Sequence, residues 1–557
     1  MSDTGFRLRM GHFGGLAVAV ALGHQAFIIL SPHQTLLEYV FSRDDAYYYF
    51  RIAQNTVELG FPTFDGLHRS SGVQFLWYIL LVALAWAVPD PISFLYAVLF
   101  LGMAFSAGAA ILLWHAMRSL HSVRLADLSM FPFAGLLIER WHTMNGMEYP
   151  LHLVIIMAII WFGARLFFHA EARTTGALVV LSALLALNYW TRLDAVIFSV
   201  FALAGLVWAI WRGPGRMTWR HLAALSLIPG LAALAYIAMS YWMAGTALPI
   251  SGAVKRVYAE HYLESSSALS IAKLWVSWLI KIQIQQSLVL VPDMVWDYTT
   301  MAYNPLKRPA ELAIPLALIA GLTWLGLTLY RRSTQDPLAW RLMCIALAIL
   351  AIGNLHIFAM IVAIGDFSHV STHYYAWEMV AWLLIGALAL NTMLATGTRL
   401  ATLAATFLIA LGAGGWAFQG ASAMIDIADP NTRSYSMSRY LLAQKLNPTL
   451  PADTRVGAWN AGALGYFLQR PVVPLDGIVN DRDFLERMER DLPIRDYLIE
   501  QRIEYLIDHN NPDLTLRRGQ RRDETTPFRN LIDWADLELV DQIGEIRMYR
   551  FIPVAAR

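Results

Sequence analysis

Long apolar runs recur along most of this chain and limit it to a protein that crosses a membrane several times. The sequence is 57% hydrophobic and 15% charged, whereas a soluble domain is about half apolar and a quarter charged. A helix needs about 20 apolar residues to cross a bilayer. We expect about eleven spans of roughly this length, near residues 13–31, 92–117, 124–140, 149–168, 175–189, 195–211, 221–244, 311–330, 339–364, 374–392 and 398–418.

The loop charges set the orientation expected for these spans. The run 73–88 has only about 16 residues, short for a bilayer, and we interpret it as a juxtamembrane helix on the outer side. The first outer loop is then 32–91, and a long outer loop covers 245–308. Cytoplasmic loops are rich in Lys and Arg, so we expect a cytoplasmic N-terminus and a multi-pass protein of the plasma (inner) membrane. The arginines that then face the cytoplasm are Arg7, Arg9, Arg165, Arg173, Arg212, Arg216, Arg220, Arg331, Arg332, Arg341 and Arg399.

The composition changes near residue 433 to that of a soluble domain. Runs such as 455–459 and 504–508 are typical of strands, and charged residues over 481–502 recur at helical spacing. We therefore expect a transmembrane domain over 1–432 and an α/β domain over 433–557. An odd number of spans places this second domain outside the cytoplasm.

Charge and cysteine content exclude several classes of protein. The net charge of +1 provides no general attraction for nucleic acid. The single cysteine, Cys344, excludes an intrachain disulfide and a thiolate metal site. Transporters usually carry ionisable residues near mid-bilayer and internal repeats. Here the charges gather at one outer face and no repeat is found, which favours an enzyme over a transporter or flippase.

The first outer loop carries two adjacent acids, Asp44 and Asp45, followed by an aromatic run that starts at Tyr47. Two carboxylates beside a bilayer are costly unless they serve a purpose. In a functional interpretation, one accepts a proton from an acceptor hydroxyl, a role typically worth 10²–10⁴-fold in rate. In a structural interpretation, both are acids at a helix N-terminus.

Other outer segments supply further candidates. Glu148 either faces the same pocket as the acidic pair or is a first-turn acid of the next span. Arg192 and Asp194 either pair with each other or line the pocket, where Arg192 would hold a phosphate oxygen. Lys255, in the long outer loop, is a candidate for a lipid phosphate, whether of a carrier or of a bulk membrane lipid. Asp65 either lines the pocket or belongs to a turn with Gly66.

His369 and His373 lie four residues apart in the last outer loop. Two histidines at this spacing share a helical face and are able to bind a metal. No carboxylate completes a zinc helix motif here, so we expect a hydrogen-bonding role for them and no metal site.

Several short segments follow one another in an order typical of one superfamily. They are Asp44 to Asn55, Phe64-Asp65-Gly66, Gly72 to Trp77, Asn145 to Glu148, Arg192 to Asp194, Ser251 to Lys255, Ala461 to Phe467 and Leu475 to Asn480. Together they resemble the GT-C membrane glycosyltransferases, closest to bacterial arabinofuranosyl- and mannosyltransferases that use polyprenyl-phosphate sugars. The resemblance spans nearly the whole chain.

This resemblance implies a GT-C fold and transfer of a sugar, with inversion, from a polyprenyl-phosphate donor to a glycan or lipid-linked acceptor. It implies that an aspartate of the first outer loop is the base, and family patterns align with either Asp44 or Asp45. Substrate-binding residues would then be Tyr48, Asp65, Glu148, Arg192, Asp194, Lys255, His369 and His373. The resemblance leaves the cofactor open: a divalent metal is compatible with it but is not indicated, and the lipid-phosphate sugar is the donor substrate. The alternative is a non-catalytic subunit of polysaccharide assembly or export that binds glycan through its outer domain.

Overall fold

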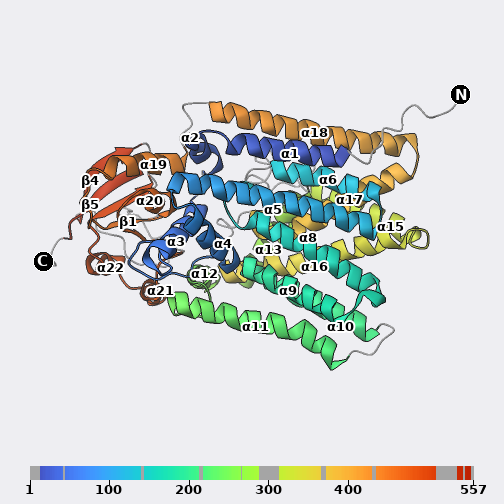
Figure 1. The fold of residues 1–557 in the computed structure, drawn as a ribbon, viewed down its shortest axis with the longest axis horizontal. Coiled ribbons are helices and arrows are strands. Elements are labelled where there is room, and N and C mark those ends of the chain that lie inside the picture. Colours follow the sequence, from blue (N-terminus) through green and yellow to red (C-terminus); the bar gives the residue numbers. More distant parts are fainter. Residues whose placement is uncertain are drawn as a thin grey trace.

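The computed structural model describes most of the chain as a bundle of long helices with a small sheet at one end (Figure 1). The described residues are 13–41, 44–138, 143–212, 218–264, 266–287, 313–364, 372–428, 434–509, 536–543 and 546–553. The main helices of the bundle are α1 (Phe13–Ile29), α5 (Pro91–Leu120), α6 (Val123–Ile138), α8 (Tyr149–Phe168), α9 (Thr175–Thr191), α10 (Val196–Arg212), α11 (Trp219–Ala244), α13 (Ala268–Ser287), α15 (Ala313–Arg331), α16 (Pro337–Ile364), α17 (Ala376–Ala395) and α18 (Arg399–Ala428).

Apolar helices confirm a multi-pass membrane protein. Within the described residues, 7 helices are long and apolar enough to cross a membrane, or up to 8 if a bent pair counts as one span. That pair is α1 with the helical segment His33–Val40, bent by 112°. Each of the eleven runs interpreted as spans contains a helix, but several are short, so the number of spans stays a prediction.

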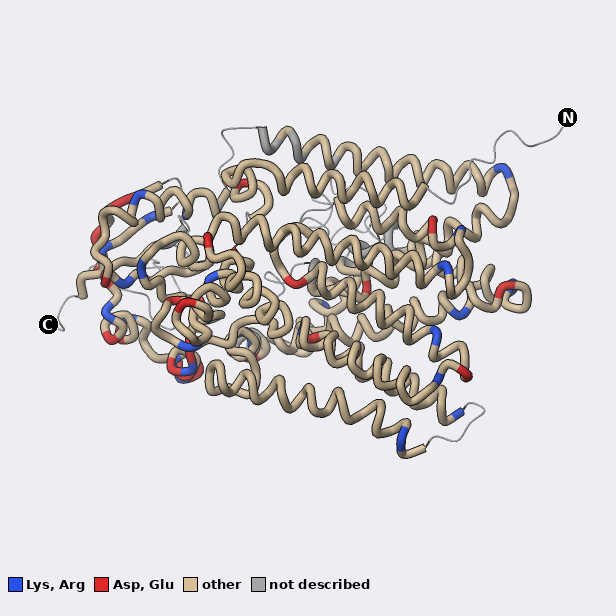
Figure 2. The backbone as a smooth tube through the Cα atoms, viewed as in Figure 1, with Lys and Arg blue, Asp and Glu red and all other residues tan. Residues whose placement is uncertain are grey.

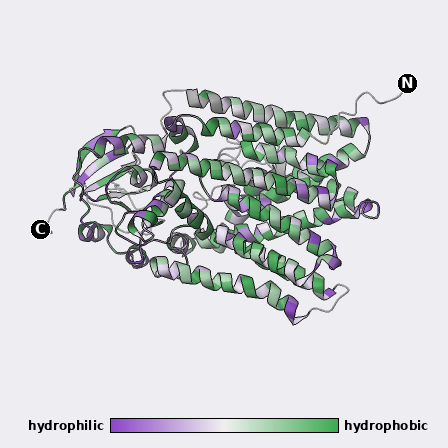
Figure 3. Cartoon of the chain, viewed as in Figure 1, coloured by the Kyte–Doolittle hydropathy of each residue, from purple (hydrophilic) through white to green (hydrophobic). Residues whose placement is uncertain are grey.

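The two ends of the bundle differ in polarity. The bundle is largely hydrophobic, whereas the sheet end carries many hydrophilic residues (Figure 3). Arginines mark the bundle end away from the sheet (Figure 2), where α5, α8, α10 and α15 each carry an arginine in the last turn. Cations suit helix C-termini, and one basic end is typical of a membrane protein with a fixed orientation.

Two short helices of the first outer loop lie between the bundle and the sheet domain (Figure 1). Helix α3 (Asp45–Leu59) ends at Gly60, whose φ of 79° requires the left-handed region that glycine tolerates. Helix α4 (Phe75–Ala87) has 13 residues, about 20 Å of helix, which is too short to cross a core of about 30 Å.

The C-terminal domain is built on a five-stranded mixed sheet in the order β2-β1-β3-β5-β4. Strand β1 pairs in parallel with β2 and β3, and β5 is antiparallel to β3 and β4. The α/β class expected for this domain is confirmed. Its strands are β1 (Val456–Ala458), β2 (Val472–Pro474), β3 (Tyr505–His509), β4 (Leu537–Ile543) and β5 (Ile546–Phe551), and its helices are α19 (Tyr435–Leu446), α20 (Gly462–Phe467), α21 (Arg482–Glu489) and α22 (Ile494–Glu500).

The core of this domain includes a helix from the long outer loop. Helix α12 (Ile250–Glu264) buries Ile250, Val254 and Val257 in one apolar cluster with residues of β2, α21 and α22. Burying such side chains contributes about 1.5–3 kcal/mol each. The sequence boundary at 433 therefore does not separate two independent cores.

The first outer loop also packs directly on the C-terminal domain. A Cβ atom at Gly72 would lie 2.2 Å from the carbonyl oxygen of Ile478, so only glycine fits. The catalytic-loop candidates are thus held between the membrane helices and the sheet domain.

Candidate active site

The structure gives the two adjacent acids of the first outer loop different surroundings. Asp44 precedes α3 and is buried. Its Oδ2 accepts a hydrogen bond from the backbone N–H of Gly462 and its Oδ1 accepts one from Ala463, both at 2.7 Å. Burial raises the pKa of Asp44 to about 7, against the opposing effects of Arg439 and these two N–H groups. Asp44 therefore fastens α3 to the start of α20.

Asp45 is the first residue of α3 and is exposed. Among the described residues its carboxylate makes no hydrogen bond and no ion pair. Asp45 thus stands at the N-terminal end of α3, a position where a helix stabilises negative charge. Of the two acids, only Asp45 presents its oxygens to a ligand.

Tyr48 lies one helical turn after Asp45 and therefore on the same face of α3. Its hydroxyl donates to Asp476 Oδ2 at 2.6 Å and accepts from the backbone N–H of Ala461 at 2.9 Å. Burial raises the pKa of Tyr48 well above its usual value, and Asp476 adds to the shift. The predicted substrate-binding tyrosine thus connects α3 to the sheet domain.

Glu148, Arg192 and Asp194 form one buried ionic cluster. Arg192 Nη1 lies 2.6 Å from Glu148 Oε1, and its Nη2 lies 3.0 Å from Asp194 Oδ2. Asp194 Oδ1 also accepts from Nε at 3.1 Å, which makes the contact bidentate. Burial alone lowers the pKa of Arg192, but Asp194 and Glu148 raise it overall. Arg192 and Asp194 do pair, and Glu148 shares the same cation.

Two members of this cluster were missed by sequence reasoning. His356 of α16 places Nε2 3.3 Å from Asp194 Oδ2 and Nδ1 2.9 Å from Glu378 Oε1 of α17. Ionisable residues inside apolar spans are rare and usually functional. That signal was present at both positions and would have identified them.

Lys255 lies next to this cluster, on α12. Its Nζ donates to the hydroxyl of Tyr374 at 2.8 Å, and the guanidinium of Arg192 lies 4.3 Å from the centroid of the Tyr374 ring. Burial lowers the pKa of Lys255, but Tyr374 and the charge of Asp45 raise it overall. The ammonium is therefore charged, and the negative charge of Asp45 is close enough to stabilise it. The neighbouring Arg256 instead pairs with Glu260 on the exposed side of the helix.

The carboxylate of Asp65 makes its hydrogen bonds within its own loop. Its Oδ1 accepts from the backbone N–H groups of Leu67 and His68, both at 2.8 Å, and its Oδ2 lies 2.6 Å from His68 Nδ1. Gly66 has φ of 79°, as a tight turn requires. The structure does not bring Asp65 together with Asp45 and Lys255.

The His68–Asp65 contact predicts a pH dependence of stability. Burial lowers the pKa of His68, but the hydrogen bond and charge of Asp65 raise it overall above 6.5. The stabilisation is then fully present below about pH 6.5 and is lost as pH rises through the folded-state value. We expect the difference in thermal midpoint between wild type and His68→Gln to be largest near pH 6 and to shrink at higher pH. A pH-independent difference would contradict this assignment.

The two histidines of the last outer loop are not placed in the site. His369 lies outside the described residues, and so does the side chain of His373. Within the described part of the chain, no three His, Cys, Asp or Glu residues come together as metal ligands.

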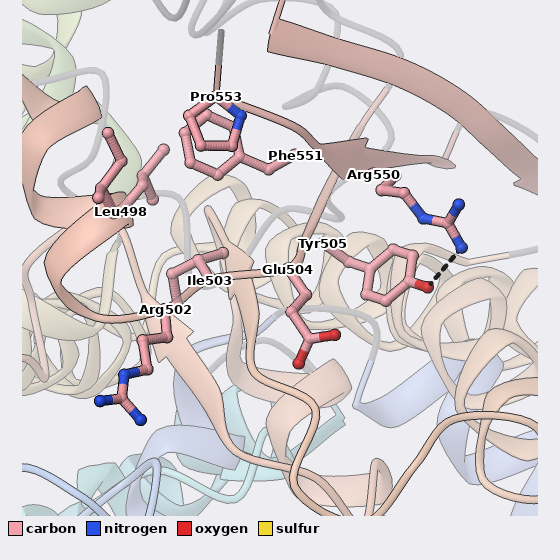
Figure 4. A pocket seen from close by; sticks show the side chains of 9 residues that line it. Leu498, Arg502, Ile503, Glu504, Tyr505, Arg550, Phe551 and Pro553 are labelled. Carbon is pink, nitrogen blue, oxygen red and sulfur yellow. Dashed lines mark hydrogen bonds between the residues drawn. The ribbon is translucent and has the colours of Figure 1, made fainter. Parts of the chain in front are cut away.

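A hollow of about 470 Å³ on the C-terminal domain lies away from this chemistry. It is lined by residues that include Arg502, Tyr505 and Arg550, and the Tyr505 hydroxyl accepts a hydrogen bond from Arg550 at 3.3 Å (Figure 4). Tyr505 begins β3, so the hollow lies at the amino end of the parallel strands. Asp476 follows the carboxyl end of β2, at the opposite edge of the sheet.

Comparison with solved structures identifies the fold. ArnT from Cupriavidus metallidurans bound to undecaprenyl phosphate matches with a TM-score of 0.50 and 10% sequence identity, over 96% of this chain and 97% of that one. Apo ArnT matches with a TM-score of 0.41 and 14% identity, over 96% and 97%. The oligosaccharyltransferase from Archaeoglobus fulgidus in the apo form matches with a TM-score of 0.48 and 12% identity, over 92% and 71%. The match to undecaprenyl-phosphate-bound ArnT shows that this chain has the GT-C fold expected from its motifs.

Sequence comparison adds a family for the C-terminal region. Residues 426–551 match the family model described as a domain of unknown function (DUF8728). No curated protein matches the chain. The particular reaction must therefore be argued from the site.

Proposed function

We propose that this chain is an inverting glycosyltransferase. It moves a sugar from a polyprenyl-phosphate donor to a hydroxyl of a glycan or lipid-linked acceptor at the outer face of the plasma membrane. Its N-terminus faces the cytoplasm and its sheet domain faces outward, in keeping with the basic end of the bundle (Figure 2). The proposal of a polyprenyl carrier draws on the similar ArnT structure, which is bound to undecaprenyl phosphate.

One observation carries this proposal. Both carboxylate oxygens of Asp44 accept hydrogen bonds, from Gly462 and Ala463, whereas Asp45 is exposed and its charge acts on Lys255. In the proposed reaction, Asp45 takes the proton of the acceptor hydroxyl. The acceptor oxygen attacks the anomeric carbon, and the bond from that carbon to the phosphate oxygen breaks. A single displacement inverts the anomeric centre and needs one base, not the flanking carboxylate pair of glycoside hydrolysis.

Lys255 would stabilise the phosphate that leaves with the polyprenyl chain. Arg192 is less available, because Glu148 and Asp194 occupy its guanidinium and the side chain is only 3% exposed. We expect Arg192 to hold Tyr374 in place, and Tyr374 to orient the Lys255 ammonium. Within the described ranges no acid forms an ion pair with Lys255, so its ammonium would be available to the leaving phosphate.

The test is transfer by the purified full-length protein in lipid nanodiscs. A panel of polyprenyl-phosphate hexoses and pentoses is supplied with a glycan and glycolipid extract as acceptor, and the release of polyprenyl phosphate is measured. We expect one donor to be consumed with sugar appearing on an acceptor. Folded protein that binds glycan but consumes no donor would support the non-catalytic subunit instead.

Removing the Lys255 charge is expected to slow the chemical step. Loss of one group that stabilises developing negative charge typically costs about 10²–10³-fold in kcat, so Lys255→Met should lower kcat by about 10²-fold. The matched control is Arg256→Met, which removes a cation from the exposed side of the same helix and should leave kcat unchanged. Equal effects of both variants would mean that Lys255 acts only through general surface charge.

A further inference from the structure

The carboxyl ends of the parallel strands β1 and β2 face α3 of the first outer loop. In α/β sheets, ligands bind outside the carboxyl ends of parallel strands. Strands β1 and β2 are parallel, and they lead into Trp459-Asn460-Ala461 and Leu475-Asp476-Gly477 respectively. These are the segments that meet α3: Ala461 donates to Tyr48 and Asp476 accepts from it.

Two helices from different parts of the chain face this edge with matched pairs of side chains. On α3, Asp45 and Tyr48 lie three positions apart and share a face of the helix. On α12, Lys255 and Tyr258 lie at the same spacing. Asp45 acts electrostatically on Lys255, and Asp476 acts on Tyr258. The cluster therefore has a cationic end at Lys255 and an acidic end at Asp476, and the charge of Asp45 acts on both.

Asp476 retains capacity for a further hydrogen bond. Its Oδ2 accepts from Tyr48, its Oδ1 accepts from the backbone N–H of Ile478 at 3.0 Å, and the backbone N–H of Asn460 adds a third donor. A carboxylate has about four acceptor positions, so one remains. Burial raises the pKa of Asp476, and the charge of Asp45 adds to the shift. Two carboxylates so placed repel each other unless donors lie between them, and a sugar supplies neighbouring hydroxyl donors.

We propose that Asp476 binds a hydroxyl of the acceptor sugar and so sets acceptor specificity. This inference rests on the proposed function, with the donor phosphate at the Lys255 end and the acceptor at the Asp476 end. The hydroxyl bound by Asp476 neighbours the hydroxyl that Asp45 deprotonates. Asp476 contacts the substrate and transfers no proton.

The kinetic test compares Asp476→Asn with wild type in nanodiscs, using the donor and acceptor that turn over. Hydrogen bonds to charged groups are strong, so the acceptor KM should rise about tenfold or more while the donor KM stays unchanged. Glu489→Gln, an exposed acid of α21, is the charge-matched control and should behave as wild type. An unchanged acceptor KM in folded Asp476→Asn would overturn the inference while the proposed function stands.

A binding test separates the two proposals and does not depend on the variant folding. A diazirine-bearing methyl glycoside panel (glucoside, galactoside, mannoside and arabinoside) is photo-crosslinked to wild-type protein and mapped by mass spectrometry. We expect attachment within 459–461, within 475–478 or at Tyr258, and the same in Asp45→Asn. Attachment only around Tyr505 and Arg550 (Figure 4), or none, would overturn the inference. Attachment as expected without any transfer would instead refute the proposed reaction.

Discussion

Asp45→Asn should lower the rate of sugar transfer by about 10²–10⁴-fold, the usual contribution of a positioned base. The amide is nearly the same size but does not accept the acceptor proton. Because the Asp45 carboxylate is exposed at the first turn of α3, the thermal midpoint should stay close to that of wild type. Transfer kinetics with the active donor, together with thermal unfolding in the same nanodiscs, measure both quantities.

Asp44→Asn is the matched control. In contrast to Asp45→Asn, it should lower the stability of the protein and leave the rate of transfer by folded protein unchanged. The amide keeps one acceptor oxygen but turns its NH₂ group toward one of the two backbone N–H donors, Gly462 or Ala463. A buried N–H group left without an acceptor costs about 1–3 kcal/mol, so this variant should lose stability and should keep the chemical step in its folded fraction. Full transfer by Asp45→Asn, with none by folded Asp44→Asn, would reverse the assignment of the base.

Arg192→Gln should be among the most destabilising substitutions outside the apolar core. It leaves the buried Glu148 and the partly buried Asp194 without their shared cation, and removing one partner of a buried ion pair costs about 3–5 kcal/mol. Arg192→Lys keeps the charge but not the planar fork that reaches both acids, so an intermediate loss is expected. The measurement is the thermal midpoint and the folded yield after purification.

A double-mutant cycle identifies the cause of this loss. Glu148→Gln combined with Arg192→Gln removes one uncompensated carboxylate along with the cation, so the double variant should be more stable than the sum of the two single effects predicts. Strictly additive effects would show that Arg192 and Glu148 are not coupled, despite the 2.6 Å contact between them.

The parts of the fold that depend on local sequence were predictable. Runs of about 20 apolar residues specify membrane helices because the bilayer demands them. The short run 73–88 predicted a short helix, and α4 has 13 residues. The strand-like runs 455–459 and 504–508 were also recognisable, and the structure has β1 and β3 there.

The different surroundings of Asp44 and Asp45 were not predictable in this way. The burial of Asp44 depends on its contact with Gly462, which lies 418 positions later in the chain. No local sequence pattern predicts a contact over that separation. Asp476 is joined to Tyr48 across a similar separation. Helix α12 is a third case, because it packs Val254 and Val257 into the core of a distant domain while its other face carries Lys255.

The most direct measurement is the configuration of the transferred sugar. Donors labelled with ¹³C at the anomeric carbon are turned over by wild-type protein, and the anomeric resonance of the product is followed by NMR. Displacement by an acceptor hydroxyl activated at Asp45 predicts a product of inverted configuration, formed as polyprenyl phosphate is released, and no such signal from Asp45→Asn. A product that retains the donor's configuration, or an equal signal from Asp45→Asn, would contradict it.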